Sequence, residues 1–328
     1  MTDGSPLALS GNWLSYHVFC ERERLRVLNN FVLPLLRGLF GTGELESFFF
    51  IHYPEGGLHF RLRLLPRASS ARTVAASVWE AAGAYTGDDG EPAHLQILEV
   101  PFELETERYG GQQLLPHSLE FFCVSSVVAL EFFLSHGFQP RSRQLSRSFR
   151  LLGQQALGLA NCVDEFLSLA GYMSFRWDED SDGSAARGDR VFEQRPQDFL
   201  AAMGDLVRSF NQSSIPSRSD GCAITFTGAA SLLSAATDAA ALNVRRSIGI
   251  SQMHMTSNRL ALDNHEESYL ARLLWRAARE LAESDQDRWQ GLQARYDMQC
   301  ADERLVLPWT EVRQQYLGRL SNGTELRE

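Results

Sequence analysis

The first hundred residues alternate between short apolar runs and amphipathic segments. Runs rich in aromatic and β-branched residues predict strands over 13–20, 48–53, 59–64 and 94–100. Apolar residues recur at helical spacing over 25–39 and 71–85. The Pro-Glu-Gly-Gly stretch at 54–57 predicts a turn, so the second and third strands form a hairpin. The resulting order βαββαβ is that of a ferredoxin-like sheet.

After residue 101 the pattern changes to long apolar segments interrupted by polar turns. Helical spacing predicts helices over 116–134, 145–173, 196–210, 228–242 and 266–283. We therefore expect an α+β fold, with a ferredoxin-like α/β part over 1–100 and a mainly helical part over 101–328 packed on it. The two parts would form one continuous functional domain, and their interface is the expected place for a cleft.

The predicted strand over 59–64 has two unlike faces. Because successive side chains of a strand point to opposite sides, one face carries His59, Arg61 and Arg63, and the other is wholly apolar. A row of positive charge needs an anion opposite, and guanidinium groups bind carboxylates or phosphates in a bidentate manner. A solvated edge strand would show the same pattern, so the strand alone leaves both interpretations open.

Two further segments carry polar residues in compact arrangements. Glu105, Arg108 and Tyr109 come after the last predicted strand, and two glycines follow them, which permits a tight turn that holds Arg108 near the end of the sheet. His254 and Asn258 are four residues apart and share a face if the segment is helical. Taken singly, Arg108 could be an ordinary ion-pair partner and His254 an ordinary buried histidine.

Composition excludes several classes of protein. The formal net charge is −10, which disfavours nucleic-acid binding as the main task. All 31 basic residues counted as Lys or Arg are arginine, so there is no lysine for a pyridoxal Schiff base or a phosphate-binding loop. Glycine-rich dinucleotide motifs are also absent from the sequence. We therefore expect chemistry without a cofactor.

Metal binding and membrane insertion are disfavoured as well. The five cysteines are scattered and form no CxxC pair, which is typical of reduced cytosolic thiols rather than a zinc site. The acidic stretch 178–183, with Asp189 at the twelfth position, resembles a calcium loop but lacks the final Glu, so a solvated loop is favoured. No secretion signal and no apolar run of about 20 residues is evident, and we expect a cytoplasmic protein without a membrane segment.

The three polar segments together resemble a known family. HFRLR at 59–63, ERYGG at 107–111 and HMTSNR at 254–259 are similar, in this order, to motifs of the C-terminal elimination domain of class I lanthipeptide dehydratases. The resemblance runs from about Trp13 to the helix after Glu266, and the same domain also occurs as a separate protein in thiopeptide pathways. It implies removal of glutamate from glutamylated Ser or Thr of a ribosomally made precursor peptide, which leaves dehydroalanine or dehydrobutyrine.

The resemblance also implies partners and a site. A separate tRNA-dependent protein would glutamylate the precursor peptide, so this chain would not contact nucleic acid itself. The catalytic residues implied are His254, Arg61, Arg63 and Arg108. Around them we expect substrate contacts from His59, Glu105, Tyr109, Asn258 and Arg259.

The chemistry of these residue types fits an elimination. Histidine titrates near neutrality and can move a proton, which makes His254 the acid/base candidate. Guanidinium groups can bind the glutamyl carboxylate and offset charge that develops in the enolate and in the leaving group. Glu105 could act as a base or orient Arg108.

Two other functions remain open at this stage. A pyridine synthase joins two dehydroalanines by a formal [4+2] cycloaddition and shares the fold, so the fold cannot distinguish it from an eliminase. A non-catalytic subunit that binds the leader peptide could use a sheet edge and a groove. The simultaneous presence of three arginines and His254 favours elimination.

Overall fold

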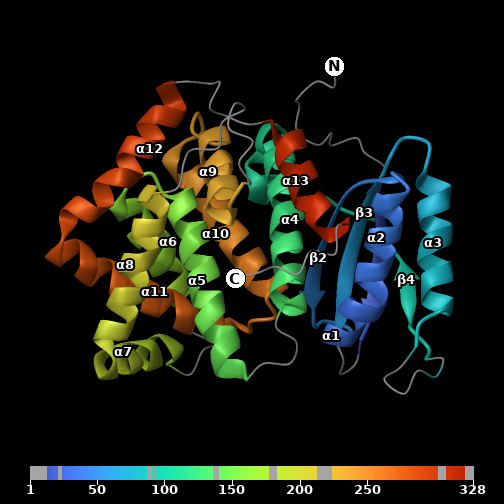
Figure 1. Cartoon of the computed structure of the whole chain (residues 1–328), viewed down its shortest axis with the longest axis horizontal. Helices are drawn as coiled ribbons and strands as arrows, with labels where there is room; N and C mark the ends of the chain where they lie inside the picture. Colours follow the sequence, from blue (N-terminus) through green and yellow to red (C-terminus); the bar gives the residue numbers. More distant parts are fainter. Residues whose placement is uncertain are drawn as a thin grey trace.

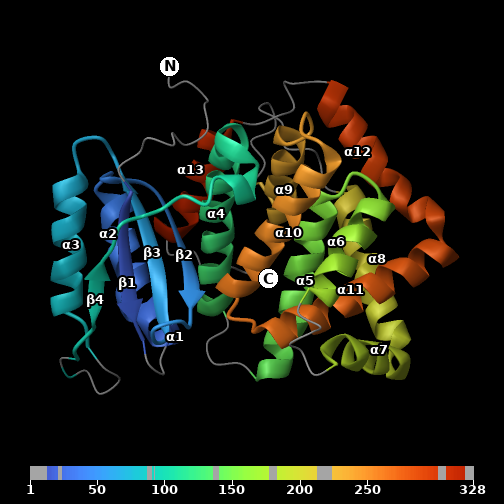
Figure 2. The same cartoon turned by 180° about the vertical axis from the view of Figure 1, so that it is seen from behind.

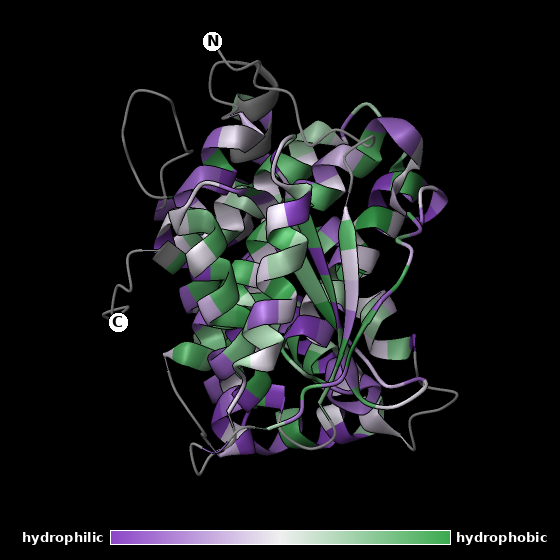
Figure 3. Ribbon diagram, turned by 90° about the vertical axis from the view of Figure 1, so that its right-hand side faces the viewer, coloured by the Kyte–Doolittle hydropathy of each residue, from purple (hydrophilic) through white to green (hydrophobic). Residues whose placement is uncertain are grey.

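The computed structural model of the chain describes residues 13–20, 24–86, 91, 93–135, 140–176, 183–212, 224–301 and 308–321. A small β-sheet with its own helices lies at one end, and a larger helical region lies at the other (Figure 1). Helix α4 stands between them, and hydrophobic and hydrophilic segments alternate along the helices (Figure 3). These features confirm the expected α+β fold.

The sheet unit has the predicted order of elements. It comprises β1 (Leu14–Phe19), α1 (Arg24–Val27), η1 (Leu28–Val32), α2 (Leu33–Gly41), β2 (Leu45–Tyr53), β3 (His59–Pro66), α3 (Ala71–Gly83) and β4 (Ile97–Glu99). The strands lie in the order β2-β3-β1-β4, and every neighbouring pair is antiparallel. This is the arrangement of a ferredoxin-like βαββαβ unit.

The two faces of the sheet differ as the alternation in β3 predicts. Phe60, Leu62 and Leu64 are fully buried in the main hydrophobic core, which includes α1, α2 and α3. On the other face, Arg61 is paired with His17 of β1 and Ile51 of β2. Figure 2 shows this second face, with the segment that follows β4 crossing in front of it toward α4.

The helical region begins with the short helix η2 (Glu107–Tyr109). The α-helices that follow are α4 (Gly111–Leu134), α5 (Arg141–Leu159), α6 (Val163–Phe175), α7 (Ser184–Gln194), α8 (Pro196–Gln212), α9 (Phe226–Ala236), α10 (Leu242–Arg259), α11 (Asn264–Ser284), α12 (Gln290–Ala301) and α13 (Trp309–Ser321), with η3 (Gln286–Trp289) before α12. Both α4 and α10 contact β2, so these two helices join the helical region to the sheet. Among the helices described, α4 has the length and apolarity of a membrane span, but 78% of its apolar stretch is buried, which identifies it as a core helix.

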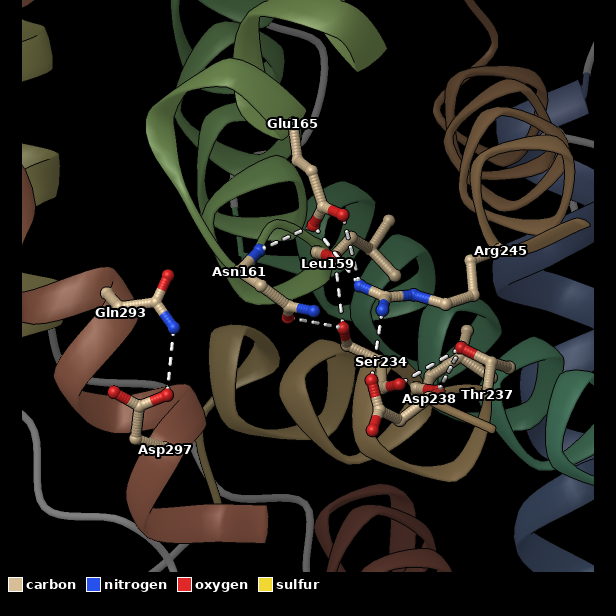
Figure 4. A network of polar contacts seen from close by, with 10 residues as sticks. Leu159, Asn161, Glu165, Ser234, Thr237, Asp238, Arg245, Gln293 and Asp297 are labelled. Atoms are coloured by element: carbon tan, nitrogen blue, oxygen red, sulfur yellow. Dashed lines mark hydrogen bonds and ion pairs between the residues drawn. The ribbon is translucent and has the colours of Figure 1, made fainter. Parts of the chain in front are cut away.

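Two predicted helices are shorter than expected because polar side chains terminate them. The segment 145–173 breaks after α5, where Ala160 and Cys162 adopt extended backbone conformations. The side chain of Glu165 accepts a hydrogen bond from the Asn161 amide at 2.9 Å, and the hydroxyl of Ser234 donates to the Leu159 carbonyl at 3.1 Å (Figure 4). These bonds satisfy backbone groups that a continuous helix would have paired internally.

The helix predicted over 228–242 ends early, at Ala236 of α9, and α10 begins only at Leu242. Thr237 closes the end of α9 by donating its hydroxyl to the carbonyls of Leu233 and Ser234. Arg245 of α10 binds both Glu165 of α6 and Asp238 in the turn after α9, and so connects α10 to α6 and to this turn (Figure 4). Of the acidic stretch, residues 178–182 lie outside the described residues, while Asp189 lies in α7.

Candidate functional site

A cleft of about 1250 Å³ lies between the second face of the sheet, the segment 101–110 and the C-terminal part of α10. Its lining is cationic although the whole protein is acidic. Among the described residues, six arginines line it (Arg24, Arg26, Arg61, Arg63, Arg108 and Arg141) against three carboxylates (Glu103, Glu105 and Asp263). A cleft lined by one sign of charge concentrates ligands of the opposite sign. The cleft is therefore suited to an anionic ligand.

Arg61 lies on the cleft face of β3 without a carboxylate partner in the described part of the chain. Its guanidinium stacks on the ring of Tyr53, with the carbon Cζ 3.2 Å from the ring centroid. Its Nε is buried and has no hydrogen-bond acceptor among the residues that the structure describes. The side chain is therefore held in place by an aromatic ring while its donors remain available for a ligand.

Arg63 is more deeply buried than Arg61, with 6% of its surface exposed. Burial, reinforced by the neighbouring charge of Arg61, lowers its pKa to about 10. Its guanidinium lies 5.1 Å from the ring centroid of Phe102, and no described carboxylate pairs with it. Because an unpaired buried charge is costly, an anion that enters the cleft next to Arg63 recovers part of that cost.

Two histidines continue the row on the same face. The rings of His17 and His59 are stacked with centroids 4.5 Å apart. Burial, with smaller contributions from His59, Arg63 and Arg61, lowers the pKa of His17 to about 4, so it is neutral at pH 7. The Nδ1 of His59 lies 2.7 Å from the Gly57 carbonyl oxygen, which places His59 against the hairpin turn. His17 was not singled out from the sequence, although its place in the strand alternation could have indicated it.

Arg108 reaches the cleft from η2. It donates to the Glu105 carboxylate at 2.9 Å and to the Ser251 hydroxyl at 3.4 Å. The tight turn expected after Tyr109 is present, because Gly110 has a φ of 83°. A Cβ atom there would lie 2.7 Å from Leu114 Cδ1, so only glycine fits.

Tyr109 forms part of the cleft floor. Its ring meets that of Phe122 edge-on, with centroids 5.0 Å apart, and 4% of its surface is exposed. Burial raises the pKa of Tyr109 to about 12, which keeps the phenol protonated at neutral pH. It can therefore donate a hydrogen bond into the cleft but cannot act as a base there.

His254 faces the cleft from α10 and is paired with a buried carboxylate. Its Nδ1 lies 2.8 Å from Oε2 of Glu267, and the side chain of Glu267 is 2% exposed. A carboxylate on Nδ1 fixes the orientation of the ring. Glu267 lies within a segment predicted only as helix, and a carboxylate at a buried helical position was the one signal that could have indicated it.

Asn258 and Arg259 occupy different surroundings. Asn258 lines the cleft, but its amide is hydrogen-bonded to the backbone of His52. Arg259 is fully buried, donates from Nε to the Ser126 hydroxyl at 3.0 Å and lies over the ring of Phe122. Burial lowers the pKa of Arg259 to about 9. Of the nine residues expected from the sequence, Arg259 alone is absent from the described lining of the cleft.

No metal-ligand cluster is present within the described ranges, since no three His, Cys, Asp or Glu side chains gather closely enough to hold an ion. Asp189, which the sequence placed at the end of a calcium-like loop, instead forms ion pairs with Arg272 and Arg276. Its carboxylate therefore connects α7 to α11.

The fold and the lining of the cleft define an α+β protein with a cationic cleft beside its sheet. The family model for the C-terminal part of lantibiotic biosynthesis dehydratases matches residues 13–278. The chain therefore belongs to this family of lantibiotic dehydratase C-terminal domains.

Solved structures share the fold at low sequence identity. The tRNA-dependent lantibiotic dehydratase MibB from Microbispora sp. 107891 matches with a TM-score of 0.60 and 19% identity over 86% of this chain. The pyridine synthase TbtD from thiomuracin biosynthesis matches with a TM-score of 0.58 and 14% identity over 83% of this chain and 99% of its own. TsrL matches with a TM-score of 0.46 and 18% identity over 87% of this chain and 99% of its own. The chain spans 29% of the length of MibB, and no curated protein matches it.

Proposed function

We propose that this protein eliminates glutamate from glutamylated Ser or Thr of a precursor peptide, giving dehydroalanine or dehydrobutyrine. One observation carries the proposal: the same cleft is lined by two arginines that have no carboxylate partner among the described residues and by a histidine paired with a buried carboxylate. Arg61 and Arg63 supply cationic donors for an anion, and His254 supplies a group that can move a proton. An elimination that expels a carboxylate needs both.

The reaction breaks two bonds and forms one π bond. A base removes the proton from the α-carbon of the modified residue, and that electron pair forms the Cα–Cβ double bond. The bond from Cβ to the ester oxygen breaks, and glutamate leaves as a carboxylate that keeps this oxygen. Arg61 and Arg63 offset the charge on the departing group, and His254 moves the proton through Nε2, with Glu267 holding Nδ1.

Arg108 would be the third arginine that binds the substrate. Its guanidinium is bonded to Glu105 at 2.9 Å and is 30% exposed, so it has free donors toward the cleft. Tyr109, which is neutral because burial raises its pKa to about 12, would donate to an oxygen of the enolate or of the ester. Glu105 would orient Arg108 rather than act as the base, since its carboxylate is already committed to that guanidinium.

The dimensions of the cleft support a peptide substrate. Its volume of about 1250 Å³ exceeds the roughly 300–1,000 Å³ typical of sites for small molecules. Residues on both sides of the modified position would therefore enter it. The glutamylated precursor would come from a separate tRNA-dependent protein, and the acidic charge of this chain is consistent with that division.

A second candidate function is that of a pyridine synthase. The similarity to TbtD, which extends over 99% of that chain, favours this candidate. A cycloaddition between two dehydroalanines involves no carboxylate leaving group, however. It would leave Arg61 and Arg63, which pair with no carboxylate in the described ranges, without an anion. A leader-binding subunit without catalysis would likewise have no use for the His254–Glu267 pair.

The test is incubation of the purified protein with a glutamylated precursor peptide. We expect free glutamate and a peptide lighter than its unmodified form by one water. Arg61→Ala and His254→Ala should each lower the rate by ~10²-fold or more, whereas Arg72→Ala on exposed α3 should not change it. Return of the glutamylated peptide unchanged, with cyclisation of a bis-dehydroalanine peptide instead, would show that the protein is a cycloaddition enzyme.

A further inference from the structure

The outer edge of β2 is covered by side chains from two helices rather than by a further strand. The Phe50 amide donates to the Ser126 hydroxyl of α4 at 3.2 Å. His52 is the next residue whose backbone N–H and C=O point away from β3. Its amide donates to Oδ1 of Asn258 at 2.7 Å, and Nδ2 of Asn258 donates to its carbonyl at 2.8 Å. The amide of Asn258 therefore replaces both hydrogen bonds that a neighbouring strand would make with His52.

The side chain of His52 strengthens the same contact. Its Nε2 lies 3.3 Å from the carbonyl oxygen of Arg259, the residue after Asn258. The ring is 6% exposed, and burial lowers its pKa to about 3, so it stays neutral and can donate from Nε2. The last residues of α10 are thus bonded to one residue of β2 at three points.

On the sheet side, His52 adjoins the residues that hold Arg61. Tyr53 is the next residue, and the Arg61 guanidinium stacks on its ring. Ile51, the preceding residue, is the cross-strand partner of Arg61. A shift of the β2 backbone at His52 would therefore move both residues that position the guanidinium.

On the helix side, Asn258 lies one turn after His254. Residues four apart in a helix lie one above the other on the same face, and both side chains line the cleft. The path from the imidazole to the guanidinium therefore consists of one helical turn, one amide bonded at two points, and one strand residue. The two hydrogen bonds of Asn258 therefore connect the helix half of the site directly to the sheet half.

We propose that Asn258 is a positioning residue, whose doubly bonded amide sets the separation between His254 on α10 and Arg61 on β3. The inference rests on the proposed elimination and assigns Asn258 a role other than direct contact with the substrate. The proton-moving group and the anion-binding group must hold one substrate between them. An error of about 1 Å in such an arrangement can cost ~10²-fold in rate.

A positioning role and a substrate-binding role of Asn258 predict different effects on kcat and KM. If Asn258 holds the two halves in register, its removal lowers kcat while the arginines still bind the substrate, so KM stays nearly constant. If Asn258 binds the substrate, its removal raises KM. A change in the hydrogen bond at His52 is a second, independent readout, because amide exchange at His52 does not depend on turnover.

The experiment compares the wild-type protein with Asn258→Ala, Asn258→Asp and the control Asn211→Ala. Asn211 also donates its side-chain amide to a backbone carbonyl, that of Arg288, but it lies away from the cleft. Asp keeps the acceptor for the His52 amide and places its second oxygen against the His52 carbonyl. We expect ~10²-fold lower kcat for both Asn258 variants with KM within about threefold, faster exchange of the His52 amide in Asn258→Ala, and no change in Asn211→Ala.

The outcomes separate this proposal from the proposed function. Absence of glutamate release by the wild-type protein refutes the elimination, while the exchange measurement still tests the hydrogen bonds at His52. Wild-type release with unchanged kcat in the Asn258 variants overturns the positioning role. A rise in KM at constant kcat overturns it as well and assigns Asn258 to substrate binding. Circular dichroism at the assay temperature should show the wild-type helical content in every variant compared.

Discussion

The imidazole of His254 and the carboxylate of Glu267 form a directed pair between α10 and α11, with Nδ1 and Oε2 2.8 Å apart. His254 is partly exposed to the cleft, whereas Glu267 is 2% exposed. A carboxylate in this position fixes the ring orientation and stabilises the imidazolium when it forms. In the proposed elimination, Glu267 would support proton transfer by His254 from within the helical region.

Replacing this carboxylate should slow the reaction without unfolding the protein. Glu267→Gln retains the size of the side chain but removes the charge that stabilises the imidazolium, so we expect the rate of glutamate release to fall by ~10- to 100-fold. Glu280→Gln, on the same helix and outside the cleft lining, serves as the matched control and should keep the wild-type rate. Equal rates for Glu267→Gln and Glu280→Gln would contradict the role of Glu267.

Substitutions at the two glycines after Tyr109 should differ, although both glycines have left-handed backbones. Gly110 and Gly111 have φ values of 83° and 80°, so alanine carries a similar conformational cost of about 1 kcal/mol at either position. At Gly110 a Cβ would also lie 2.7 Å from Leu114 and 2.8 Å from Ile248, whereas at Gly111 nothing lies within 4 Å. We expect Gly110→Ala to lower the free energy of unfolding by ~1–3 kcal/mol more than Gly111→Ala.

Urea denaturation of both variants provides the measurement. Because the turn carries Arg108 into the cleft, the Gly110 variant should also lose more activity than the Gly111 variant. Equal stability of the two variants would mean that Leu114 and Ile248 move aside without loss of stability, which contradicts the prediction.

The stability of the fold should depend on pH through His52. Burial lowers the pKa of His52 in the folded protein to about 3, from the ordinary histidine value of 6.5. Between these values the unfolded chain binds a proton that the folded protein does not, so stability present above pH 6.5 is lost as the pH falls. One such group contributes a slope of ~1.4 kcal/mol per pH unit.

His52→Gln removes the titrating group while keeping a side-chain amide that can donate. We expect the free energy of unfolding of this variant, measured in urea at pH 7, 6 and 5, to fall less steeply than that of the wild-type protein. The exposed His94 offers a control, because His94→Gln should leave the wild-type slope unchanged. If the free energy of unfolding falls equally steeply with pH in the wild type and in His52→Gln, His52 does not contribute to the pH dependence.

A buried ion pair joins α13 to α4. Arg313 is hydrogen-bonded to Glu120, which is fully buried, and lies 3.4 Å from Glu46. Removing one partner leaves the other charge buried, so we expect Arg313→Met to cost ~3–5 kcal/mol in the free energy of unfolding. The double variant Arg313→Met, Glu120→Gln should regain most of this loss, as measured in urea. Additive losses in the double variant would show that the two side chains do not interact.

Local patterns in the sequence predicted those features that depend on neighbours in the chain. The alternation over 59–64 predicted which face of β3 is apolar, because side-chain direction in a strand follows directly from residue parity. The glycines after Tyr109 predicted the turn, because few residues other than glycine adopt a positive φ. The ends of α5 and α9 were missed, since the groups that replace the helical hydrogen bonds come from Glu165, Ser234 and Thr237 through the folded arrangement.

The sequence by itself determined the order of strands and helices in the first hundred residues, the cationic face of β3, and the turn that presents Arg108. Only the tertiary structure decided which distant residues meet across the cleft. Asn258 and His52 are 206 positions apart, and their hydrogen bonds exist because α10 lies along the edge of β2. Contacts of this kind depend on the burial of whole helix and sheet faces rather than on local spacing. The same is true of the contact between His254 of α10 and Glu267 of α11.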